Sequence, residues 1–288
     1  MKMLFLATLI IVGCIVAGLF LWRWSDHQAD RRIGASLAAT QPENPAQFDP
    51  EMVADLPEPA RRYFSFTIRP GTPLYTVAEI EMVGQFSLGT KESPDYMAMR
   101  AHQVLAAPEG FVWRMSARNG PMSVSGSDAA ADGMSWTRFW VMGLVPVARI
   151  SGTDDHRRSA FGRYVAEAVF WTPAALLPGP GVVWEQVNET TARVTVTHEG
   201  IQQSVDVTVD AEGRPLTVVF PRWSDANPEK TFKLQPFGGS LTQFRDFDGF
   251  RLPTHVEAGN QFGTDAYFPF FIADITGITF PSQLASGR

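Results

Sequence analysis

The feature that most constrains the fold is a strict alternation of apolar and polar residues in the second half of the chain. The alternation runs one for one from residue 192 to 197, is interrupted by Glu199-Gly200, and resumes from Ile201 to Val209. Because successive side chains of a β-strand point to opposite faces, this pattern predicts two strands with one buried and one solvated face. The glycine supplies the backbone freedom that a tight reversal requires. The segment is therefore expected to be an antiparallel hairpin.

This hairpin is one of several strand–turn units along the chain. Asp210–Gly213 is a turn before an apolar run at 216–220, and Asp246–Gly249 is a turn before another at 250–256. Further strands are indicated at 76–88, 94–106, 111–117 and 131–142. Sequential hairpins at this spacing predict one large antiparallel sheet, curled into a half-barrel.

One segment between the strands departs from period two. Its apolar residues recur at the spacing of one helical face, at Phe161, Tyr164, Val165, Ala168 and Val169. Asp154 or Asp155 is the expected N-cap, and Arg163 and Glu167 are placed to form an i,i+4 ion pair. Pro173 is expected to interrupt the helix because proline lacks an amide N–H and clashes with the preceding turn. We expect a lid or plug over the concave face of the sheet, in an α+β, mostly β fold.

The chain begins with an apolar segment. Met3–Trp22 carries no charge, and about 20 such residues are needed for a helix to cross a bilayer. Trp22 and Trp24 stand where an interfacial aromatic belt is expected. Two alternatives stay open: a cleaved signal peptide, whose apolar region is usually shorter, and a lipoprotein signal ending at Cys14. The preferred interpretation is an uncleaved transmembrane anchor.

These features divide the chain into three parts: an anchor at 3–22, a tether at 23–48 and a single β-rich domain at 49–288. A short helix from Asp49 to about Phe66 is expected to open the domain, with Asp49 as its N-cap. Since an N-terminal anchor commonly exports the domain attached to it, we expect a single-pass protein of the inner (cytoplasmic) membrane. The domain would then lie in the periplasm or outside the cell.

Composition and motifs exclude several classes of function. The net charge is −6 and basic residues occur in no run longer than a pair, so nucleic acid is not an expected partner. The only cysteine lies in the apolar segment and the five histidines are scattered, so neither a metal site nor a cofactor is expected. No nucleophile elbow, phosphate loop or zinc-protease motif is found, and no catalytic residue is assigned. Asp154, Asp155, His156 and Glu167 keep a hydrolase open as a less favoured alternative.

Methionine and tryptophan side chains gather in the first half of the predicted sheet. Met97 and Met99 share one strand face, as do Trp113 and Met115. Methionine adapts to varied apolar partners, so these residues favour a cavity for a lipid or another apolar molecule. The expected ligand-binding residues are Met97, Met99, Trp113, Met115, Tyr164 and Trp171. The rival interpretation is a filled core in a structural or protein-interaction module of the cell envelope, whose protein partners are unknown.

Several short motifs carry a resemblance to a known family. They are Leu56-Pro57-x-Pro59, Arg62-Tyr63, Gly110-Phe111-Val112-Trp113, and Arg163-Tyr164-x-x-Glu167-x-x-x-Trp171-x-Pro173. With these, residues 54–280 resemble a family of uncharacterised bacterial proteins, a domain of unknown function. The resemblance implies a β-rich layout similar to the LolA/LppX-like lipoprotein-carrier architecture, and assigns motif roles to Arg163, Glu167 and Pro173. The chain departs from the family pattern near its end, where Asn260 and Pro269 replace the usual tryptophan and arginine.

Overall fold

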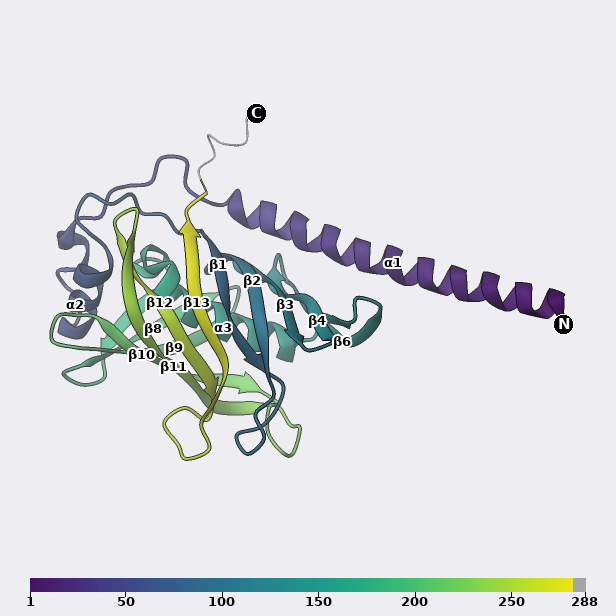
Figure 1. Cartoon of the computed structure of the whole chain (residues 1–288). Helices are drawn as coiled ribbons and strands as arrows, with labels where there is room; N and C mark the ends of the chain where they lie inside the picture. The colour runs from purple at the N-terminus through teal and green to yellow at the C-terminus, as the bar shows by residue number, and fades with distance from the viewer. Residues whose placement is uncertain (282–288) are drawn as a thin grey trace.

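In the computed structural model, which describes residues 1–281, one antiparallel sheet of thirteen strands forms the body of the protein (Figure 1). The strands are β1 (Ala78–Ser87), β2 (Tyr96–Ala106), β3 (Gly110–Asn119), β4 (Met122–Ala131), β5 (Met134–Val141), β6 (Val145–Ser151), β7 (Val182–Gln186), β8 (Thr191–His198), β9 (Ile201–Val209), β10 (Pro215–Ser224), β11 (Lys233–Phe247), β12 (Phe250–Asn260) and β13 (Phe268–Thr279). The helices are α1 (Lys2–Ala38), α2 (Glu58–Thr67) and α3 (Asp154–Trp171), with single 3-10 turns η1 (Pro50–Val53) and η2 (Pro173–Leu176). The mostly β expectation is confirmed.

The strand order shows how the chain builds the sheet. β1 lies beside the central strand, and β2 to β6 follow one after another to one edge. The chain then crosses through α3 to the opposite edge at β7, and β8 to β13 return to the centre, where β13 pairs with β1. The two edge strands β6 and β7 do not pair with each other, so the sheet is curled but unclosed.

The hairpin predicted from the alternation is β8–β9. His198 pairs with Ile201, so Glu199 and Gly200 form a two-residue turn, and both have positive φ angles of 48° and 78°. Two positive φ angles are the signature of the turn whose twist matches a β-hairpin. The alternating valines of both strands are buried, which confirms the predicted register of the buried face.

Helix α3 lies inside the curl of the sheet and contacts strands of both halves (Figure 1). Most of its residues from Ala160 onward are buried, so it is an internal plug. The expected N-cap was wrong: Thr153 caps the helix, its hydroxyl oxygen accepting a hydrogen bond from the His156 backbone N–H at 3.1 Å. Asp154 and Asp155 occupy the first turn, where they favour the positive end of the helix dipole. The interruption at Pro173 is confirmed, since η2 starts there.

The opening of the domain follows the expected pattern. The Asp49 side chain accepts a hydrogen bond from the Glu51 backbone N–H at 3.0 Å and so caps η1, and α2 follows after Pro57. Tyr63 of α2 is fully buried and its hydroxyl donates to the Val169 carbonyl at 2.5 Å. This bond joins α2 to the C-terminal turn of α3.

Helix α1 differs from the expectation. It continues without a break to Ala38, so the first part of the proposed tether at 23–48 is not a linker but a helix packed on the sheet. Its buried residues Asp26, Asp30, Ile33 and Leu37 lie at helical spacing along one face. They contact the outer face of the sheet, since the apolar partners include Val104 and Val112, which alternate with the core residues of β2 and β3. The apolar N-terminal half of α1 projects beyond the domain (Figure 1).

Candidate functional site

A cavity of about 250 Å³ lies between α3 and the concave face of the sheet. Nine of its lining residues are aromatic: Phe86, Trp113, Phe139, Phe170, Trp171, Phe220, Phe237, Phe270 and Phe271. They come from strands on both halves of the sheet and from α3, so no single segment of the chain builds the wall. A mostly apolar wall with a few placed polar groups is typical of small-molecule sites.

Glycines of β11 contribute to the shape of this wall. Gly238 and Gly239 line the cavity, and a Cβ atom at Gly239 would come within 2.4 Å of the Glu257 carbonyl oxygen. Larger residues are therefore excluded from this position by backbone of the neighbouring strand. The missing side chains leave space between the aromatic rings.

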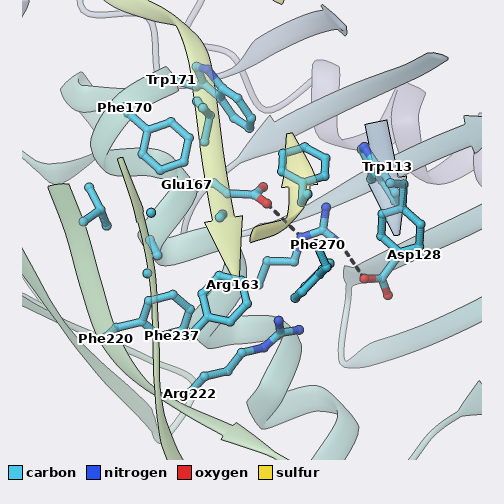
Figure 2. Close-up of a pocket in the computed structure, with 18 of the residues that line it drawn as sticks. Trp113, Asp128, Arg163, Glu167, Phe170, Trp171, Phe220, Arg222, Phe237 and Phe270 are labelled. Atoms are coloured by element: carbon cyan, nitrogen blue, oxygen red, sulfur yellow. Dashed lines mark hydrogen bonds and ion pairs between the residues drawn. The ribbon is translucent and has the colours of Figure 1, made fainter. Parts of the chain in front are cut away.

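Four charged residues line the cavity, and three of them form one connected group. The Arg163 guanidinium donates from Nη1 to Asp128 Oδ2 at 2.5 Å and from Nε to Glu167 Oε1 at 2.8 Å (Figure 2). It also lies 4.7 Å from the ring centre of Phe111 and 5.0 Å from that of Trp113. Burial by itself lowers the pKa of Arg163, but the two carboxylates outweigh it and the pKa is raised. The predicted i,i+4 pair is confirmed, and Asp128 of β4 is a partner that the sequence did not indicate.

The carboxylates of this group have further partners. Gln103 Nε2 donates to Glu167 Oε2 at 2.5 Å, and the Thr137 hydroxyl donates to Asp128 Oδ1 at 2.9 Å. His156 Nε2 lies 2.9 Å from the same hydroxyl. Burial lowers the pKa of His156, so its imidazole is neutral at pH 7. Both carboxylates are therefore held by Arg163 and by neutral hydrogen-bond donors.

Arg222 of β10 is the fourth charged residue and differs from Arg163 in having no polar partner. Its guanidinium makes no hydrogen bond or ion pair with any residue from 1 to 281, and its Nε atom is buried. The ring centre of Phe237 lies 4.8 Å from the guanidinium carbon. Burial, together with the charge of Arg163, lowers the pKa of Arg222 to about 10, so the side chain is still charged at pH 7. Figure 2 shows it in the same part of the cavity as Arg163, with no dashed line reaching it.

The residues expected to bind a ligand are not all brought to this cavity. Trp113 and Trp171 line it, as do Arg163 and Glu167. The other expected ligand-binding residues, Met97, Met99, Met115 and Tyr164, are buried in the surrounding core and do not line it. Pro173, expected only as a motif residue, is also buried outside the lining. The methionines therefore fill space behind the wall.

The lining residues that sequence reasoning missed include Phe220, Phe237, Phe270 and Arg222. Phe220 lies in a predicted strand, but period two alone does not tell which face of a curled sheet borders a cavity. The strands of Phe237 and Phe270 were not predicted. Their convergence depends on strand order, which no local pattern reveals.

The residues considered for a hydrolase do not form a catalytic arrangement. Asp155 accepts a hydrogen bond from Trp223 Nε1 at 2.7 Å, while Asp154 pairs at the surface with Arg157. His156 Nδ1 lies 2.8 Å from the Ser135 hydroxyl, but Ser135 is buried and neither residue lines the cavity. Among residues 1–281, no group of three or more histidine, cysteine, aspartate or glutamate side chains is placed to hold a metal ion.

The comparison with protein families places the chain. The model of a family of unknown function, DUF6544, matches residues 46–272. The chain belongs to this family. Its membership confirms the resemblance to an uncharacterised family, and the match spans α2, α3 and the sheet up to β13. No curated protein sequence matches the chain.

Solved structures with a similar arrangement have low sequence identity. A LolA superfamily protein from Nitrosomonas europaea is 10% identical, with 77% of this chain and 91% of that chain covered and a TM-score of 0.42. A predicted outer membrane lipoprotein-sorting protein domain from Vibrio parahaemolyticus is 12% identical, with 83% and 93% covered and a TM-score of 0.37. A DUF1329 family protein from Desulfovibrio piger is 11% identical, with 89% and 94% covered and a TM-score of 0.39. At these values the likeness does not extend beyond the fold.

Proposed function

We propose that the protein is a membrane-anchored, extracytoplasmic binder or carrier of a lipid or another apolar molecule. The observation that carries this proposal is the aromatic cavity between α3 and the concave face of the sheet. A protein-interaction module with a filled core would not need this space. The volume is slightly below the roughly 300–1,000 Å³ of typical small-molecule sites. This volume suits one acyl chain segment and is too small for a whole phospholipid.

The membrane part of the proposal rests on α1. An 18-residue window of this helix has a mean hydropathy of 2.8 and none of it is buried by the domain. An exposed apolar helix of this length is stabilised by lipid and not by water. We propose that residues 3–22 span the inner membrane and that the domain lies on its outer side.

Binding is tested with the full chain in lipid nanodiscs and a fluorescent fatty acid. The test variant is Val218→Trp, because Val218 lines the cavity and a tryptophan there fills it. The matched control is Val219→Trp, whose side chain points to the other face of β10. We expect saturable binding to the wild type and to the control, and at least a tenfold loss for Val218→Trp. Equal binding by both variants would show that the cavity is not the ligand site.

A further inference from the structure

The cavity holds one arginine, Arg222, whose side chain finds no hydrogen-bond acceptor among residues 1–281. A guanidinium has five N–H donors, and buried donors in folded proteins are almost always paired. The Arg222 side chain makes no hydrogen bond to any described residue, and its Nε atom is buried without one. Stacking on Phe237 orients the guanidinium plane but accepts none of these hydrogen bonds.

The neighbouring carboxylates do not fill this role. Asp128 and Glu167 are both engaged by Arg163, and Asp225, directly after the end of β10, makes no ion pair with Arg222. The four cavity charges sum to zero, so net charge is not what is lacking. Arg222 lacks hydrogen-bond acceptors. Burial and the charge of Arg163 lower its pKa more than the carboxylates raise it.

We propose that Arg222 binds the oxyanion head, a carboxylate or phosphate, of an amphiphile whose apolar chain lies against the aromatic wall. The proposal rests on the ligand-binding function proposed above and names the chemical class of the ligand. A planar guanidinium matches two oxygens of a carboxylate or phosphate with two parallel hydrogen bonds. The chain meets Phe220, Phe237 and Phe270 beside it. The cavity thus combines one polar end with an apolar body, as such a ligand requires.

The test compares four ligands of equal chain length on the full chain in nanodiscs, by displacement of the fluorescent fatty acid. They are dodecanoate, methyl dodecanoate, dodecanol and dodecylamine, with acetate and inorganic phosphate as headgroups without a chain. Because a hydrogen bond to a charged group contributes about 1.5–3 kcal/mol, dodecanoate should bind at least ~10-fold more tightly than the ester or the alcohol. If acetate or phosphate displaces the probe as well as dodecanoate does, the ligand is a free anion. That result would overturn the proposal that the ligand is an amphiphile.

Two variants separate the role of Arg222 from general packing. Arg222→Gln should abolish the preference for dodecanoate while dodecanol affinity stays unchanged, and Arg222→Lys should keep part of it. Arg245→Gln is the matched control, since Arg245 also lies over a phenylalanine ring, Phe247, but does not line the cavity. Equal affinities of acid, ester and alcohol in the wild type, or a preference that persists in Arg222→Gln, would overturn the inference alone. Absence of binding by all four ligands would overturn the proposed function as well.

A second, independent observation concerns the junction of α1 with the domain. The Trp22 ring packs edge-on against that of Trp140 in β5, with 5.5 Å between the ring centres. Arg23 Nη2 donates to the Ser125 hydroxyl of β4 at 3.1 Å. The β5–β6 turn lies at this level, because a Cβ atom at Gly143 would meet the Arg23 guanidinium. The Met142 backbone N–H donates to the Ser123 carbonyl at 2.8 Å and so places the adjacent β3–β4 turn beside it. These turns are therefore level with the end of the apolar segment of α1.

The β5–β6 turn and the first residues of β4 and β6 carry exposed apolar side chains. We call Met122, Met142, Val145 and Val147 the apolar rim; each is more than half exposed. Exposing a cluster of apolar side chains to water is unfavourable, and such patches mark interaction surfaces. The rim continues from the point where α1 would leave the bilayer.

We infer that the apolar rim contacts the headgroup layer of the membrane that α1 spans. The test uses the full chain in liposomes, in a Cys14→Ser background, with a fluorescent label at Met142→Cys or Val147→Cys. Glu212→Cys, in the turn beside α2 at the other end of the domain, is the control. Lipids with a shallow spin label should quench the two rim labels and spare the control. Rim labels that escape quenching while Trp22 and Trp24 are quenched would overturn the inference; tryptophans that also escape would refute the membrane span itself.

Discussion

Asp26 of α1 and Arg149 of β6, 123 positions apart in the sequence, form a two-bond ion pair with N–O distances of 2.5 and 3.0 Å. Trp140 Nε1 donates a third hydrogen bond to Asp26 at 2.9 Å. The pair joins the helix that carries the apolar segment to the edge of the sheet. Together with the contacts of Trp22 and Arg23, the pair makes the C-terminal part of α1 and the domain one packed unit.

Asp26→Asn should destabilise this docking. Burial by itself raises the pKa of Asp26, but hydrogen bonds from Arg149 and Trp140 outweigh it and the pKa is lowered. A lowered carboxyl pKa contributes stability above the unfolded value of 3.8, and this stability is lost as pH falls below it. We expect a loss of about 1–3 kcal/mol at pH 7, measured by denaturant unfolding in detergent, that disappears in acid. Glu229→Gln, at an exposed pair, should cause no measurable change; an equal loss there would contradict the prediction.

Asp30→Asn should change the free energy of unfolding in the opposite direction from Asp26→Asn, although Asp30 lies one turn further along the same helix. Burial raises the pKa of Asp30, and the hydrogen bond from the Ser127 hydroxyl at 2.7 Å compensates only in part. A raised carboxyl pKa costs stability as pH rises above 3.8. Asparagine keeps the acceptor for Ser127 and removes the charge. Unfolding at pH 7 should show equal or higher stability, with the gain vanishing toward pH 3; a loss comparable to that of Asp26→Asn would refute this account.

Arg163→Leu should be among the most destabilising changes in the domain. Removing this guanidinium leaves Asp128 and Glu167 in the cavity wall without their cation. Breaking a buried ion pair on one side costs about 3–5 kcal/mol. Arg222→Leu is the comparison, because the Arg222 side chain makes no hydrogen bond or ion pair with residues 1–281, and it should leave stability unchanged or increased. Thermal unfolding of both variants tests the contrast, and similar losses would show that Arg222 has an internal partner.

The side of the membrane can be tested by reporter fusion. If residues 3–22 span the inner membrane with the domain outside, alkaline phosphatase fused after Asp30 should be active, because this enzyme folds only where its disulfides form. A fluorescent-protein fusion at the same position should be dim in this arrangement. An inactive phosphatase with a bright fluorescent fusion would reverse the orientation.

Local patterns predicted the elements whose structure depends on neighbouring residues. The alternation at 192–209 predicted β8 and β9, and the Pro173 break and the Arg163–Glu167 pair followed from helical spacing. β4 was missed because its sequence is mostly serine, glycine and alanine, and only pairing with β3 and β5 makes it a strand. The packed half of α1 was missed because two of its four buried residues are aspartates, and a segment with these charges is typical of a solvated linker.

The sequence by itself thus determined an apolar N-terminal helix, a series of β-hairpins and one helix between them, because strand and helix periodicities are set within a few residues. Tertiary structure decided which strands are neighbours, and hence that β1 pairs with β13 across the centre of the sheet. It also decided that Asp128 and Arg222, from opposite halves of the sheet, border the same aromatic cavity. The physical reason is that a cavity depends on long-range register and curvature. Those are set by how all thirteen strands pack around α3.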